Sequence, residues 1–362
     1  MICFVRRSTI DYDIRLKKYV DACIGTNTPY IAITWDRLED SMSRYPYEYQ
    51  YKAKAPYGGG GNNLLQFVGF VFFLYWNLLI RFKKYKVIHA CNLEIFILVF
   101  PFKFLGKKVF FDIYDSVNTK VESTLCKWTD VLILPHQKRL SQIGITVNDV
   151  KRFFVVENVP RFDSNINIKK KDINSHNNII LSYVGVFERN IRGIENIMRL
   201  VSEDNRLELH IAGVGAGMES LVEEYANKCS RIIYYGKVSY EKALSIMNNS
   251  HFIIALYYLS NPLHKYASPN KFYESLFLGI PIITSSNTLV GDRVKDGNTG
   301  YVVDDNYDSL KSVFDNLSTE EFAMCYKTKS ENCSHIWQTK YNSYFDVVLK
   351  QEYINLINEE SK

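Results

Sequence analysis

The chain has 362 residues, of which 47% are hydrophobic, so it is long enough for two domains that each bury a core. Its formal net charge of +5 suits anionic lipid or phosphate ligands, but it is too small to indicate a nucleic-acid-binding protein. The 7 cysteines are scattered, without a CxxC pair or a zinc-ligand spacing, which indicates reduced thiols in a cytoplasmic protein.

The chain begins with a short apolar run, MICFV, that precedes the first basic residues. A secretory signal peptide has positive charge first and then a longer apolar stretch. We therefore expect a first buried strand at this end and no signal peptide.

Apolar runs that are typical of buried strands alternate with helical stretches along the chain. The first series is MICFV, YIAITW, YKVIHA, KKVFFDIY, DVLILP and FFVVEN, and the second is IILSYVG, LELHIAG, RIIYYG, FIIALYY, IPIITS and GYVVDD. Continuous apolar strands separated by helices predict parallel sheets with helices on both faces. Two such series predict an α/β fold of two doubly wound, Rossmann-like domains.

A polar, Asn-rich stretch without apolar periodicity, from Arg161 to Asn178, separates the two series. We expect an N-terminal domain over residues 1–165, a linker over 166–178 and a C-terminal domain over 179–335. The remaining residues, 336–362, have a helical pattern.

The segment from Leu64 to Ile80 is apolar on all sides, and a basic run follows it. A membrane-spanning helix needs about 20 apolar residues. This segment is shorter and contains Gln66 and Asn77. Three interpretations remain open: a buried core helix, a helix in the membrane interface and a true span. The basic residues, which favour the interfacial helix, are Arg81, Lys83, Lys84 and Lys86.

The stretch SPNKFYESLFLGIPIITS predicts a short helix, a glycine stop and a strand. Ser268 can cap the helix, and Pro269 fits its first position. A cation at Lys271 is then disfavoured, because the start of a helix already carries partial positive charge. A bound diphosphate would make Lys271 its counter-ion, and Glu274 could accept hydrogen bonds from a ribose. The alternative is a solvated lysine with a glutamate partner three residues along.

A second cation lies near a helix start in the loop after the strand that ends at Gly185. Arg192 and Gly193 open this helix, so a phosphate would again account for the charge. Arg189 is a second candidate in the same loop, and the alternative is two surface arginines.

Further polar and glycine-rich candidates lie in the first half of the chain. The glycines 58–61 allow a ligand to approach the backbone closely, or they form a flexible loop. Asp112, Tyr114 and Asp115 follow a strand, at the edge where open α/β sheets bind ligands. Asp115 could instead cap the next helix, and His89, also at a strand end, could be structural.

One glycine pattern argues against a nicotinamide cofactor. HIAGVGAGMESL has Met218 where the dinucleotide fingerprint needs its last glycine, and it lies in the second half of the chain. This departure disfavours an oxidoreductase.

Together, these motifs resemble the retaining glycosyltransferases of family four (group 1), which have the GT-B architecture of two facing Rossmann-like domains. YVGVFERNIRGI resembles the first phosphate loop of the family. SPNKFYESLFLGIPIITS with VKDGNTGYVV resembles its donor-site signature, the most specific match. DYDIRLKKYVDA, VIHACN and VFFDIYDS resemble its acceptor domain, and IWQTKYNSYFDVVL resembles the helix that crosses back to the first domain.

The resemblance implies a role for each matching residue. Arg192 and Lys271 would hold the donor diphosphate and Glu274 the ribose, while Tyr114 and Asp115 complete the catalytic set. The donor-binding residues would be Gly185, Arg189, Gly236, Val238, Tyr266, Pro269 and Asn270. The acceptor side would consist of Gly59, Gly60, Gly61, His89 and Asp112.

Three positions depart from the family pattern. Tyr266 stands where a first carboxylate is often found, and Val186 stands where an arginine often follows the strand glycine. Tyr114 stands near the place of a histidine in many members. The first and third changes affect contacts with the sugar.

The resemblance implies a metal-independent hexosyltransferase that uses a nucleoside-diphosphate sugar, with UDP or GDP, and retains the anomeric configuration. The acceptor would be a hydroxyl of a glycan or polyprenyl-diphosphate-linked oligosaccharide in bacterial capsule or O-antigen biosynthesis. We expect no cofactor, metal or nucleic acid, and a cytoplasmic protein with an inner-membrane surface as a partner. The alternatives are an epimerase of the same architecture and a non-catalytic subunit of a glycan assembly complex.

Overall fold

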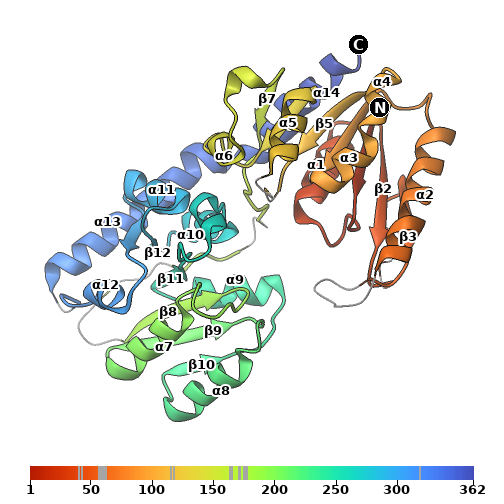
Figure 1. The fold of residues 1–362 in the computed structure, drawn as a ribbon. Helices are drawn as coiled ribbons and strands as arrows, with labels where there is room; N and C mark the ends of the chain where they lie inside the picture. Colours follow the sequence, from red (N-terminus) through yellow and green to blue (C-terminus); the bar gives the residue numbers. More distant parts are fainter. Residues whose placement is uncertain are drawn as a thin grey trace. The chain divides into compact units, whose positions relative to one another are not determined.

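The computed structural model describes residues 1–39, 41, 44–55, 63–114, 116, 119–162, 166–169, 173, 178–317 and 319–362. The chain divides into two compact units (Figure 1). Unit 1 consists of Met1–Asn158 and Ser343–Lys362, and unit 2 consists of Val159–Asn342.

The expected domain limits at residues 165 and 336 both fall inside unit 2. Aromatic packing accounts for this position. The ring of Phe162 stacks on Phe277 with the centroids 3.9 Å apart, and the ring of Trp337 lies 5.3 Å from that of Phe277. These aromatic contacts hold both Phe162 and Trp337 in unit 2, so the unit extends beyond both expected limits.

Unit 1 is built on a seven-stranded sheet in the order β3-β2-β1-β4-β5-β6-β7, in which every described pair is parallel. The strands are β1 (Ile2–Arg6), β2 (Tyr30–Asp36), β3 (Glu48–Lys52), β4 (Val87–Cys91), β5 (Lys108–Asp112), β6 (Val131–Leu134) and β7 (Phe153–Val155). The strand β3 is absent from the sequence prediction because EYQYK is polar and only partly buried at the sheet edge. The other six strands match the predicted runs.

Helices cover both faces of this sheet. They are α1 (Ile14–Gly25), α2 (Leu64–Ile80), α3 (Leu93–Val99), α4 (Pro101–Phe104), α5 (Lys120–Trp128), α6 (Arg139–Ile143), η1 (Val147–Asp149), the π-helical η4 (Phe345–Tyr353) and α14 (Ile354–Glu360). Alternate residues of β1 enter two separate cores: Val5 packs with the α2 and α3 side, and Phe4 packs with α1 and the C-terminal segment. The predicted doubly wound arrangement is thus confirmed in unit 1.

The helix α2 has one buried face and one exposed apolar face. Phe70 stacks on Trp35 with a centroid distance of 5.3 Å, whereas Phe72 is 73% exposed and Trp76 is 66% exposed. Among the described residues, no helix is both long and apolar enough to cross a membrane. The interpretation of this segment as a true span is therefore wrong, and α2 is neither fully buried nor polar on its outer side.

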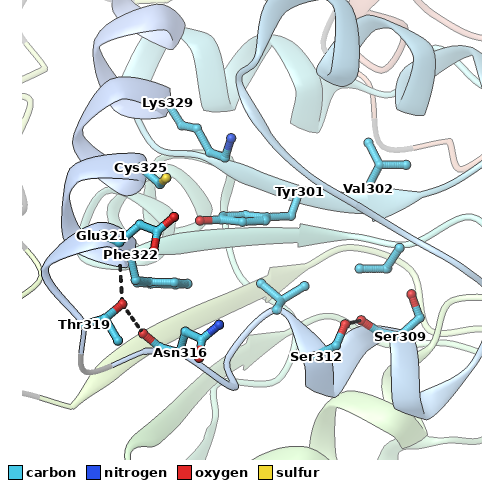
Figure 2. A pocket seen from close by; sticks show the side chains of 12 residues that line it. Tyr301, Val302, Ser309, Ser312, Asn316, Thr319, Glu321, Phe322, Cys325 and Lys329 are labelled. Atoms are coloured by element: carbon cyan, nitrogen blue, oxygen red, sulfur yellow. Dashed lines mark hydrogen bonds between the residues drawn. The ribbon is translucent and has the colours of Figure 1, made fainter.

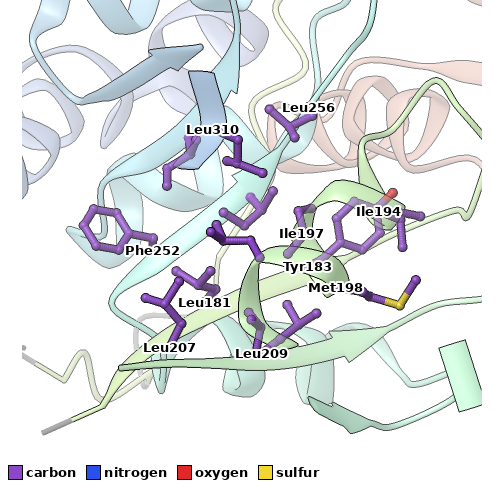
Figure 3. Packing of buried hydrophobic residues seen from close by; sticks show 14 of the residues in the cluster. Leu181, Tyr183, Ile194, Ile197, Met198, Leu207, Leu209, Phe252, Leu256 and Leu310 are labelled. Atoms are coloured by element: carbon purple, nitrogen blue, oxygen red, sulfur yellow. The ribbon is translucent and has the colours of Figure 1, made fainter. Parts of the chain in front are cut away.

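Unit 2 is built on a six-stranded parallel sheet in the order β10-β9-β8-β11-β12-β13. Its strands are β8 (Ile179–Val184), β9 (Leu207–Ala212), β10 (Ile232–Tyr234), β11 (Phe252–Ala255), β12 (Ile282–Ser285) and β13 (Gly300–Val303). Its helices are α7 (Ile194–Glu203), α8 (Glu219–Lys228), α9 (Tyr240–Asn248), η2 (Pro262–Tyr266), α10 (Asn270–Leu278), α11 (Leu289–Gly297), α12 (Tyr307–Ser312), α13 (Glu320–Ile336) and the π-helical η3 (Trp337–Tyr341). Figure 3 shows the core between the sheet and α7, where Ile197 and Met198 pack among strand residues such as Leu209.

A fully buried polar network ties the C-terminal segment into unit 1. The guanidinium of Arg15 forms two hydrogen bonds with the carboxylate of Asp112, of 3.0 and 2.8 Å, and the hydroxyl of Tyr19 donates to the same carboxylate at 2.8 Å. His89 Nε2 lies 3.3 Å from Asp112 Oδ2, and its Nδ1 lies 2.7 Å from the hydroxyl of Tyr353. Because a buried charge is costly unless it is paired, the network depends on all of these partners.

The ammonium group of Lys18 is also buried, beside this network. Burial, and then the charge of Arg15, lower the pKa of Lys18 to about 7. The unfolded chain keeps the ordinary value near 10.5, so above pH 7 the folded state loses this proton first and the unfolded state binds more protons. The contribution of Lys18 to the free energy of unfolding should therefore rise with pH between 7 and 10.5.

We predict that Lys18→Met removes this pH dependence. Denaturant unfolding of both proteins should show that the stability of the wild type relative to the variant rises by on the order of 2–4 kcal/mol between pH 7 and pH 10. Lys83→Met, at an exposed lysine of the same unit, should leave the wild-type pH profile unchanged. Parallel profiles for the wild type and Lys18→Met would contradict the lowered pKa.

Candidate active site

Three loops of unit 2 meet at the edge where the strands β8, β9 and β10 end. The amide of Gly213 donates to the carbonyl of Gly236 at 2.9 Å, and the amide of Phe187 donates to the carbonyl of Val214 at 3.1 Å. Gly213 has φ +145°, and a Cβ atom there would lie 1.8 Å from the carbonyl oxygen of Gly185. Only glycine permits this close approach, so the predicted donor residues Gly185 and Gly236 are brought together.

Arg192 lies at this edge, one residue before the glycine that caps α7. Its Nε donates to Glu188 Oε2 at 2.5 Å, and its guanidinium carbon lies 4.7 Å from the ring centroid of Tyr257. Gly193 occupies the N-cap position in the left-handed conformation, with φ +62°. The guanidinium is thus held beside the start of α7, where an anion is favoured.

The helix α10 carries the second predicted cation. Its N-cap is Pro269, so the predicted cap at Ser268 is wrong by one residue; the extended backbone of the proline, ψ 145°, delays the first helical turn. Lys271 Nζ lies 3.3 Å from Glu274 Oε2. The side chain of Glu274 is 1% exposed and that of Lys271 is 20% exposed, so the lysine reaches solvent while the carboxylate stays in the protein.

Two tyrosines that sequence reasoning missed lie near these charged groups. Burial raises the pKa of Tyr257 to about 12 against the lowering effect of Arg192, and the charge of Glu274 raises it further. Burial, and then the charge of Glu274, also raise the pKa of Tyr240. Tyr257 follows the end of β11, so its place at a strand end is the signal that could have identified it.

His264, in the short helix η2, is a third side chain that the sequence prediction did not include. It is 5% exposed, its Nδ1 lies 2.9 Å from the carbonyl oxygen of Tyr258, and its ring lies 5.4 Å from that of Tyr257. Burial, and then the charge of Arg192, lower the pKa of His264. A neutral histidine therefore supports the loop that carries Tyr257.

The remaining predicted donor residues lie along the same loops. Arg189 is exposed in the loop after β8, and Val238 is partly buried in the loop after β10. Tyr266 ends η2 and is partly buried, and Asn270 begins α10. The structure thus places all of the donor-binding candidates in segments that follow β8, β10 or β11 of one sheet.

The predicted residues of unit 1 are divided between its core and its surface. His89 and Asp112 are 0% exposed and belong to the buried network, so neither side chain reaches the surface, where an acceptor would bind. Tyr114 donates from its hydroxyl to Cys91 Sγ at 3.4 Å, and the guanidinium of Arg6 covers its ring at 4.4 Å. Asp115 and the loop Gly59, Gly60 and Gly61 lie outside the described residues.

A cavity of about 340 Å³ lies at the edge of unit 1 where β1 and β2 end. It is lined by Arg6, Ser8, Thr9, Tyr12, Asp13, Trp35, Arg37 and Leu38. None of these residues was named as a site residue, although Tyr12 and Asp13 belong to the stretch DYDIRLKKYVDA that resembles the acceptor domain. The polar run RRST directly after the first strand is a signal that could have identified Arg6, Ser8 and Thr9.

Another cavity, of about 400 Å³, lies between β13, α12 and α13 of unit 2 (Figure 2). The stacked rings of Tyr301 and Phe322 form one wall, and Lys329 and Glu321 lie at its polar side. No predicted site residue lines this cavity. In the part of the chain that the structure describes, no group of three or more His, Cys, Asp or Glu side chains is placed to hold a metal ion.

We predict that a side chain at Gly193, the residue after Arg192, destabilises the fold. A Cβ atom there would lie 2.5 Å from Leu256 Cδ1 and 2.7 Å from the hydroxyl of Tyr258. Gly217 has a similar φ of +65° but nothing within 4 Å. Gly193→Ala should therefore cost about 1–3 kcal/mol more than Gly217→Ala in denaturant unfolding, because only the former adds a clash. Equal losses of unfolding free energy in the two variants would contradict the prediction, because they would show that the neighbouring side chains move to avoid the clash.

The comparisons with known proteins bear on the same unit. A family model described as "Glycosyl transferases group 1" matches residues 163–333. No curated protein sequence matches the chain at a significant level. Solved structures are similar over nearly the full length. The apo form of the lipopolysaccharide outer core galactosyltransferase WaaB has 15% sequence identity, a TM-score of 0.67 and 99% coverage of both chains.

Two further structures have the same architecture. HepE of Anabaena, in complex with UDP and glucose, has 13% identity, a TM-score of 0.70 and 99% coverage of both chains. The sucrose-phosphate synthase of Thermosynechococcus elongatus has 15% identity, a TM-score of 0.69 and 99% coverage of both chains. At this low identity the similarity concerns the fold alone. Residues 163–333 are thus similar to the group 1 glycosyl transferases, and the chain that carries them has the GT-B fold.

Proposed function

We propose that the protein is a retaining glycosyltransferase that moves a sugar from UDP or GDP to a hydroxyl of a glycan or lipid-linked oligosaccharide. The observation that carries the proposal is the placement of Arg192 and Lys271 at the starts of two helices, α7 and α10, on the strand-end edge of one sheet. Cations at these helix ends suit a bound diphosphate. HepE, a structural neighbour, is solved with UDP-glucose, which supports a nucleotide-sugar donor.

The proposed reaction depends on charge that develops when the sugar leaves the nucleotide. Negative charge then grows on the diphosphate, where Arg192, Lys271 and the amides of the two helix starts stabilise it without a metal ion. Glu274 binds the ribose hydroxyls. The acceptor hydroxyl attacks the face that the diphosphate leaves and gives its proton to the departing diphosphate oxygen, so the C–O bond to the nucleotide is replaced with the anomeric configuration retained.

We predict that Lys271→Ala and Glu274→Ala each lower sugar transfer by about 100-fold or more, as expected for the loss of a group that stabilises the transition state. The measurement is transfer of labelled sugar from a panel of UDP and GDP sugars to membrane or glycan acceptors. Lys228→Ala removes a lysine whose side chain is 73% exposed and should keep full activity. Wild-type rates in both site variants would refute the assignment.

Two rival functions make different predictions about the donor. An epimerase would isomerise the nucleotide sugar without an acceptor, which NMR of the donor alone would detect. A non-catalytic subunit, suggested by Tyr266 and Val186, would bind no nucleotide in calorimetry. A thermal-shift screen of nucleotide sugars should come first, because a nucleotide sugar that binds the folded state raises its apparent stability and thereby identifies the donors to test.

We further propose that unit 1 lies on the cytoplasmic surface of the plasma membrane through the outer face of α2. Its exposed apolar residues are Leu64, Leu65, Val68, Phe72, Trp76, Leu79 and Ile80. A patch of this kind is uncommon on a monomeric protein surface. Exposed lysines follow directly at Lys83, Lys84 and Lys86, which suits anionic headgroups beside an interfacial helix. A lipid-linked acceptor in polysaccharide assembly would be reached from this position.

We predict that the pair Phe72→Ser and Trp76→Ser lowers binding to vesicles that contain phosphatidylglycerol by about 10-fold or more, because two large side chains no longer enter the interface. Cosedimentation measures the bound fraction. Met324→Ser, at a residue of unit 2 that is 67% exposed, is the matched control and should bind like the wild type. Equal binding by all three proteins would exclude this membrane surface.

A further inference from the structure

Each of the two cations at the strand-end edge of unit 2 is paired with a carboxylate of its own. Arg192 Nε lies 2.5 Å from Glu188 Oε2, and Lys271 Nζ lies 3.3 Å from Glu274 Oε2. A diphosphate that binds here must therefore share or replace existing partners. This inference rests on the proposed function, in which the diphosphate of the donor binds these cations.

The two pairs differ in how firmly the carboxylate is held. Glu274 is 1% exposed on the helix α10, so it stays in place. The side chain of Glu188 is 35% exposed in the loop between β8 and α7. Within the described part of the chain, Arg192 is the single hydrogen-bond donor to the Glu188 carboxylate. A partly exposed ion pair contributes only about 0–1 kcal/mol, so Glu188 can be displaced at little cost.

Arg192 keeps its position without Glu188. Its guanidinium lies 4.7 Å from the ring centroid of Tyr257, and that residue is anchored because its amide donates to Ser285 Oγ at 2.9 Å. The guanidinium has five N–H groups, and the pair with Glu188 uses Nε. Loss of the carboxylate therefore frees charge on Arg192 without removing its support.

We propose that Glu188 competes with the diphosphate of the donor for Arg192 and thereby weakens nucleotide binding. The carboxylate neutralises Arg192 while the site is empty. When a nucleoside diphosphate arrives, Glu188 must move away, and two like charges near one another then favour departure of the product. Glu188 thus sets how easily UDP or GDP is released, a step that limits the rate in many enzymes.

The test is the affinity of the full chain for UDP and for GDP, measured by calorimetry at one fixed salt concentration. Glu188→Gln keeps the size of the side chain and removes its charge, and it should tighten binding by about 3–10-fold. Glu224→Gln is the matched control. Glu224 lies on α8, and its side chain is 55% exposed and forms an ion pair with Lys228. It should change the affinity by less than about 2-fold.

A double-mutant cycle with Arg192→Ala shows whether the effect acts through the arginine. Glu188→Gln should no longer tighten binding in the Arg192→Ala protein. Unchanged or weaker binding by Glu188→Gln, or an equal gain from Glu224→Gln, would overturn the competition while leaving the proposed function intact. Wild-type affinity in Arg192→Ala, or no binding of either nucleotide by the wild type, would overturn both.

Discussion

Parallel strand pairing is the constraint on which the rest of the molecule depends. In both sheets it brings the carboxyl end of every strand to one edge, so loops that are distant in the sequence meet there. In unit 2 the hydrogen bond from Gly213 to Gly236 and the close approach to Gly185 lock these loops together. The charged residues Arg192 and Lys271 lie at the starts of α7 and α10, the helices that follow the paired strands β8 and β11. The candidate site is a consequence of the topology, and its chemistry depends on the few side chains that this edge carries.

Much of the fold could be predicted from the sequence because continuous apolar strands are its main signal. The strand β3 was not predicted because its residues are polar and mostly half-buried at the edge of the sheet. The places of Arg192 and Lys271 at helix starts could be predicted from motifs that lie within single loops. The supporting side chain His264 could not, because its place depends on packing between loops. The approach of Tyr240 to Glu274 joins α9 to α10, a contact that no local pattern encodes.

In unit 1, the sequence pattern predicted site residues that the structure places in the core. Asp112 ends β5, at the place where ligands bind in open α/β sheets, yet it is fully buried. His89 was expected at a strand end, but it lies in the middle of β4 and is fully buried as well. His89 contacts Tyr353, which is 264 residues away from it in the chain. A pattern read from neighbouring residues cannot reveal such a partner. The helix α2 was ambiguous for a related reason: its composition is apolar on every side, and only packing against the sheet separates the buried Phe70 from the exposed Phe72.

The contact between His89 and Tyr353 also bears on the order in which the protein folds. One core of unit 1 includes Leu349, Tyr353 and Ile357 from the end of the chain, whereas the core of unit 2 consists of residues within its own continuous segment. During synthesis, unit 2 can therefore complete its core before unit 1 can. Until the segment from Leu349 to Ile357 has left the ribosome, the apolar face that contains Phe4 and Tyr19 has no cover, and the nascent chain needs protection from aggregation at that stage.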